Sequence, residues 1–128
     1  MMKPYLIISY IILCLVIGAW ADALFDSGVK LWAHSLGALE ILLLLSGAFV
    51  FNLRRKDWVV FIVTFILWRV VGFDYLYNLF RGLEWDYIGS TSNWDLFLSK
   101  QQGIIFGRII FLIGAIFIPI QYKWTQNS

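Results

Sequence analysis

Four long apolar stretches constrain this chain more than any other feature. A helix of about 20 apolar residues, rising about 1.5 Å per residue, crosses the hydrocarbon core of a bilayer. Such stretches cover residues 5–24, 29–53, 58–80 and 103–122. Only 14% of the residues are charged, whereas soluble domains average about 25%. We therefore predict an all-α integral membrane protein.

The connections between the stretches predict their arrangement. The first two, "DSGVK" and "NLRRKD", are short turns, and short loops place consecutive helices antiparallel. The third connection, residues 82–102, contains "YIGSTSNWDLFLSK", in which Ser92 or Asn93 can cap a short helix with apolar surface. We expect one domain, residues 1–128, folded as a four-helix antiparallel bundle. The short helix is expected to lie at the membrane interface.

Basic residues predict the orientation, because the cytoplasmic loops of membrane proteins are the more basic ones. Placing the amino terminus inside leaves Lys30, Arg81 and Lys100 outside, and puts five basic residues in the cytoplasm: Lys3, Arg54, Arg55, Lys56 and Lys123. We predict that both termini are cytoplasmic and that the membrane is a plasma membrane or a bacterial inner membrane.

The first apolar stretch has a second interpretation. Lys3, the apolar run after it and the small residues of "AWA" at positions 19–21 also match a secretory signal peptide. Cleavage of such a peptide would leave three spans.

Charged side chains within the spans need partners. Each unpaired charge at the centre of a span costs about 2.5–3.5 kcal/mol. Counted from the exterior ends, Glu40 and Arg69 lie about 15 Å deep, and Asp74 and Arg108 about 9 Å deep. We therefore predict that Glu40 pairs with Arg69 and Asp74 with Arg108. For the deeper pair, a purely structural role in fixing helix register is an equally good interpretation.

Polar residues gather in the predicted outer half and indicate a ligand site. Asp74, Asn78 and Arg81 follow one another at helical spacing on one stripe of the third span. We predict an outward-facing polar cavity that binds or transports a polar or anionic ligand or a lipid headgroup. Two arginines would hold the anion, and the predicted ligand-binding residues are Asp74, Asn78, Arg81, Arg108, His34 and Tyr77.

The sequence favours no other chemistry. One cysteine and one histidine predict neither a disulfide nor a metal centre. We predict no catalytic residues and no cofactor, because no known catalytic motif is present. A lipid-modifying enzyme using His34 and Asp74 as acid and base is the least supported function. A net charge of +2 predicts no nucleic acid partner.

Glycines predict close helix contacts. The fourth span opens with "GIIFG" and continues to Gly114, while Gly37 and Gly47 share the side of the second span that carries Glu40. Besides the lipid bilayer, the partner at these seams is another helix of this chain, a second copy or another membrane protein. The last two possibilities make an interaction or assembly subunit the alternative function.

Overall fold

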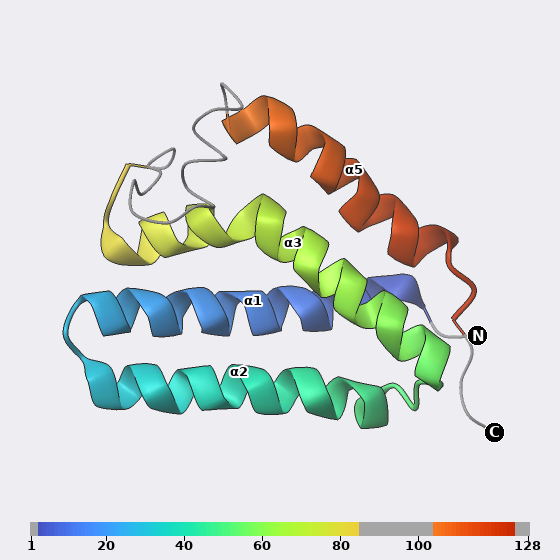
Figure 1. Ribbon diagram of the computed structural model, residues 1–128, viewed down its shortest axis with the longest axis horizontal. Helices are drawn as coiled ribbons and strands as arrows, with labels where there is room; N and C mark the ends of the chain where they lie inside the picture. Colours follow the sequence, from blue (N-terminus) through green and yellow to red (C-terminus); the bar gives the residue numbers. More distant parts are fainter. Residues whose placement is uncertain (1–2, 85–103, 125–128) are drawn as a thin grey trace.

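The four apolar stretches of the sequence are helical, as predicted. The computed structural model describes residues 3–84 and 104–124, the latter with backbone only at 104–108. Its helices, shown in Figure 1, are α1 (Pro4–Asp26), α2 (Lys30–Val50), α3 (Arg55–Arg81) and α5 (Ile104–Gln121). No strand occurs in this part of the chain. The all-α prediction is confirmed, and each helix ends within a few residues of the predicted boundary. The predicted interfacial helix lies outside the described residues.

The helix ends follow from local chemistry. Pro4 stands in the first turn of α1, where a missing N–H costs nothing. Gly28 has φ +89° in the turn between α1 and α2, a conformation that favours glycine. Gly82 has φ 67° directly after α3 and caps its end by donating its N–H to the carbonyl of Leu79. The chain therefore encodes these helix boundaries locally.

The helices have the properties of membrane-spanning segments. By length and composition, α1, α2 and α3 can each cross a bilayer, with mean hydropathies of 2.2, 1.7 and 1.9. The part of α5 whose side chains are described, Ile109–Gln121, is apolar but shorter. Large apolar side chains point outward, among them Leu31 at 79% and Phe49 at 85% exposure. Such surfaces suit lipid and not water, so the structure indicates a membrane protein.

Helix α1 lies at the centre of the fold. It packs against both α2 and α3, and α3 packs in turn against α5 (Figure 1). Side chains from three turns of α1, Ile7, Ile11 and Leu15, are almost fully buried. By contrast, Ala33 and Gly47 are the buried residues of α2. Because α1 lies between its two neighbours, any contact between α2 and α3 at mid-height must pass α1.

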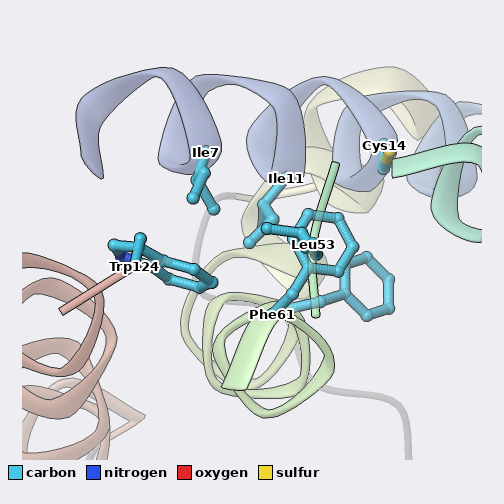
Figure 2. Packing of buried hydrophobic residues seen from close by; sticks show 7 residues of the cluster. Ile7, Ile11, Cys14, Leu53, Phe61 and Trp124 are labelled. Atoms are coloured by element: carbon cyan, nitrogen blue, oxygen red, sulfur yellow. The ribbon is translucent and has the colours of Figure 1, made fainter. Parts of the chain in front are cut away.

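The apolar core closes the end of the bundle at which α1 begins, here called the amino-terminal end. Figure 2 shows Ile7 and Ile11 of α1 pointing toward Phe61 of α3. The other buried members of this cluster are Cys14, Leu53, Phe65 and Trp124. The Trp124 indole N–H donates to the carbonyl of Pro119 at 2.7 Å. The segment after α5 therefore folds back onto the start of the bundle. The opposite end, which holds the turn between α1 and α2 and the end of α3, is called the turn end.

A buried carboxylate attaches that returning segment. Asp57, in the first turn of α3, is fully buried. One of its oxygens accepts the backbone N–H of Arg54 at 3.3 Å, and the other accepts the hydroxyl of Tyr122 at 2.7 Å. This hydrogen bond to Asp57 raises the pKa of Tyr122 above its ordinary value. Asp57 thus caps α3 and holds the segment after α5 at the same time.

We expect Asp57→Ala to destabilise the fold by about 1–3 kcal/mol, because a buried cap and the acceptor for Tyr122 are lost together. Tyr122→Phe removes one hydrogen bond and should have a smaller effect. Thermal unfolding in detergent, followed by circular dichroism, measures both. The double variant should lose less than the sum of the single losses.

Strictly additive losses would contradict the link between Asp57 and Tyr122.

The pH dependence of stability supplies a control. Because the pKa of Tyr122 is raised in the fold, its stabilisation is present while the hydroxyl is protonated and is lost as pH rises above about 10. The difference between the wild type and Tyr122→Phe should therefore shrink in alkali.

Candidate functional site

A charged pair crosses the middle of the fold. Arg69 Nη1 of α3 lies 3.6 Å from Glu40 Oε1 of α2. This distance is too long for a hydrogen bond but close enough for strong electrostatic attraction. The side chain of Glu40 is 14% exposed and that of Arg69 is 43% exposed, so the carboxylate is the enclosed partner. The contact is the one expected from equal depth in the two spans.

Gly18 of α1 makes this pair possible. A Cβ atom placed on Gly18 would collide with the carbon and both oxygens of the Glu40 carboxyl group. The carboxylate therefore lies directly against the backbone of α1, and through this notch α2 reaches α3. Gly18 was not among the residues predicted from the sequence. Its signal was that it is the one glycine in the first apolar stretch.

From Arg69, a stripe of side chains follows α3 toward the turn end. The Arg69 guanidinium lies 4.1 Å from the ring centroid of Phe73, in cation–π geometry. The Phe73 ring stacks on the ring of Tyr77 with their centroids 6.4 Å apart. These residues repeat at every fourth position, which places them on one face of the helix. The aromatic ring of Phe73 therefore lies against part of the Arg69 guanidinium.

The stripe ends in polar contacts with the last residues of α1. The Tyr77 hydroxyl donates a short hydrogen bond to the Asp26 carboxylate. One turn later, Arg81 Nη1 donates to the hydroxyl oxygen of Ser27 at 2.9 Å. Both predicted ligand residues are thus used to join α3 to the end of α1.

The other predicted ligand residues lie elsewhere. Asn78 is 1% exposed and lies inside the packed interior, and Asp74 is half-buried. Both take part in contacts within the fold. Arg108 belongs to α5, but its side chain is outside the described part, so its pairing with Asp74 stays a prediction. Among the described residues of the predicted set, Tyr77, Asn78 and Arg81 therefore serve contacts within the fold.

A groove opens instead between α1 and α2 near the turn end. Its volume is about 370 Å³. Residues from α1 and α2 line it, and most of them are small or apolar: Ala21, Asp22, Phe25, Ala33, His34, Gly37, Ala38 and Ile41. His34 is the one member of the predicted ligand set that lines this groove. A cavity with an apolar lining and few polar groups is typical of sites for small organic molecules.

Two ionisable side chains face this groove. Asp22 lies on α1 one turn after Gly18, and its charge interacts with those of Arg69 and Glu40. Within the described residues, no hydrogen bond or ion pair shorter than 4 Å reaches its carboxylate. On the α2 side, the exposed His34 ring meets the ring of Phe25 at a centroid distance of 5.8 Å. Asp22 therefore presents its carboxylate to the groove without a close partner in the described part of the chain.

The glycines differ in what they face. A Cβ on Gly37 would have no heavy atom within 4 Å, so this glycine widens the groove. A Cβ on Gly47 would lie 2.7 Å from the ring of Phe61, and one on Gly114 would lie 3.7 Å from Leu67. Gly47 and Gly114 therefore serve contacts within the chain, whereas Gly37 leaves space.

The described residues contain no group of three or more His, Cys, Asp or Glu side chains that could hold a metal ion. No protein-family model matches the sequence, and no curated protein or solved structure is significantly similar to it. The geometry of the groove and of the charges behind it is therefore what bears on function.

Charge reversal tests the central pair. We expect Glu40→Arg and Arg69→Glu each to reduce the yield of folded protein strongly, because each brings two like charges together. Even one unpaired charge at mid-membrane costs about 2.5–3.5 kcal/mol. The double reversal should recover most of the yield. Size-exclusion chromatography of detergent extracts measures the monodisperse fraction, and a double variant no better than the single ones would contradict the pairing.

The notch supplies an independent check of the same pair. Gly18→Ala should lower the unfolding temperature, because its methyl group displaces the Glu40 carboxylate. Combined with Glu40→Ala, the same change should instead be neutral or stabilising, since alanine favours a helix over glycine by about 1 kcal/mol. Gly37→Ala is the matched control, because its methyl group enters empty space.

Proposed function

We propose that this chain is an integral membrane protein built as an antiparallel bundle of four spans, including α1. Three helices of spanning length and their apolar outer surfaces support this. The central packing of α1 favours its retention in the folded protein over its removal as a signal peptide. Without it, α2 and most of α3 would lose the helix against which they pack.

We propose further that both termini are cytoplasmic and that the turn end faces the exterior. The cluster of Arg54, Arg55 and Lys56 at the amino-terminal end supports this orientation. A reporter that matures only in the cytoplasm, fused after Ser128, would remain inactive if the orientation were reversed.

The function we propose is binding or transport of a polar, amphiphilic ligand in the groove between α1 and α2. The observation that carries it is an ionisable pair of residues, Asp22 and His34, facing open space in an otherwise apolar lining. Ionisable residues within spans mark ligand or ion pathways by default. The carboxylate of Glu40, which belongs to the central pair, is by contrast only 14% exposed.

The depth of the groove indicates the shape of its ligand. Asp22 precedes the end of α1 by one turn, about 6 Å, and His34 lies at the same depth in α2. Ile41, which also lines the groove, lies about 16 Å from the start of α2. The groove thus runs from the headgroup level into the hydrocarbon level. A molecule with a polar head and an apolar body fits such a gradient.

Filling the groove tests this function. Gly37→Phe places a ring in the empty space beside Asp22, and we expect it to remove a ligand that copurifies with the wild type. Native mass spectrometry of gently purified protein detects that ligand as a discrete added mass. Gly37→Ala should retain it, because a methyl group leaves most of the space open.

A folded Gly37→Phe variant that retains the added mass would refute binding in this groove. A wild type that carries only a broad distribution of bulk lipid would weigh against a dedicated ligand. Circular dichroism and elution volume establish that each variant is folded before it is compared.

A further inference from the structure

We propose that the groove takes a lipophilic cation, in which an ammonium or similar positive group is attached to an apolar body, with the positive charge at Asp22. The inference rests on the proposed function and specifies its ligand class. It differs from the anionic ligand that the arginines of the sequence predicted.

The charged side chains near Asp22 already have partners within the fold. Glu40 pairs with Arg69, Asp26 accepts the hydroxyl of Tyr77, and Arg81 donates to Ser27. Asp22 is the one acidic or basic side chain in the groove lining besides His34. A ligand in the groove therefore meets Asp22 as its nearest uncommitted charge.

The charges nearest to Asp22 favour a positive ligand. Two carboxylates, Asp22 and Glu40, share the single guanidinium of Arg69, and its charge interacts with both. The balance of these three groups is one negative charge. This excess of negative charge repels an anion and attracts a cation. The predicted anion-binding arginine, Arg81, lies outside the groove lining.

An aromatic side chain in the groove lining also favours a cation. Phe25 lines the groove, and its ring already attracts the ammonium of Lys30, whose Nζ lies 5.8 Å from the centroid. Aromatic faces attract cations through their quadrupole. Lys30 itself is exposed at the first residue of α2 and does not line the groove.

The groove also has room for the apolar body of such a cation. Beyond Asp22 and His34, the lining consists of small side chains that lead to Ile41. A volume of about 370 Å³ lies at the small end of the usual range for organic ligands, about 300–1,000 Å³. A compact hydrophobic cation can place its charge at Asp22 and its body against these residues.

The test uses two probes of the same shape and opposite charge. Tetraphenylphosphonium is positive and tetraphenylborate is negative. The full chain is reconstituted in nanodiscs of zwitterionic lipid, and saturable binding is measured by equilibrium dialysis against empty nanodiscs. We expect saturable binding of the phosphonium and none of the borate.

Substitutions locate the binding. Asp22→Asn keeps the shape of the side chain but removes its charge, and should weaken phosphonium binding at least tenfold. Asp26→Asn is the matched control. It removes the same charge from a residue that lies one turn after Asp22 and does not line the groove. It should change the affinity less than threefold. Gly37→Phe should abolish binding.

The possible results separate the two proposals. If Asp22→Asn binds the phosphonium as tightly as the wild type, or if both aspartate variants weaken it equally, the cation site at Asp22 is refuted. If the wild type binds the borate and Gly37→Phe abolishes this, the groove binds ligands but the inferred charge is wrong. If neither probe binds saturably and the wild type carries no discrete added mass, both proposals fail.

Discussion

The contact of Glu40 with the backbone of α1 at Gly18 is the constraint on which the rest of the fold depends. Because α1 lies between α2 and α3 at mid-height, the acid on α2 meets the base on α3 at a place where α1 has no side chain. Gly18 supplies that place, and Arg69 completes the pair. Three helices are thereby held at one level, and the register of each against the others follows.

The two ends of the bundle differ because of what lies on either side of this pair. Toward the amino-terminal end, large apolar side chains fill the space, and buried Asp57 holds the segment after α5. Toward the turn end, alanines and Gly37 face one another across α1 and α2, so the helices leave a groove between them. Stability is concentrated at one end and open space at the other. Proteins with sites on a rigid scaffold commonly show this division.

Much of the fold could be predicted because the signals were local. The boundaries of the spans follow from runs of apolar residues, and the match of Glu40 with Arg69 follows from depth along the helix. The candidate site could not be predicted in the same way. Asp22 lies near a helix end, where an acid is ordinary. Only the fold shows that the face of α1 carrying Asp22 lies toward Gly37 and His34 across the groove. The stripe of Asp74, Asn78 and Arg81 was correct as helical geometry, but packing buries Asn78 and directs Arg81 to Ser27.

The amino-acid sequence by itself determined the helices, their apolar character and the depth of each charge. These properties depend on composition and on a constant rise per residue, so they can be counted along the chain. Only the tertiary structure decided which faces meet, because the rotation of a helix about its axis is set by how its small and large side chains fit those of its neighbours. That fit places the Glu40 carboxylate against Gly18, and it places Gly37 and Asp22 in the lining of one groove.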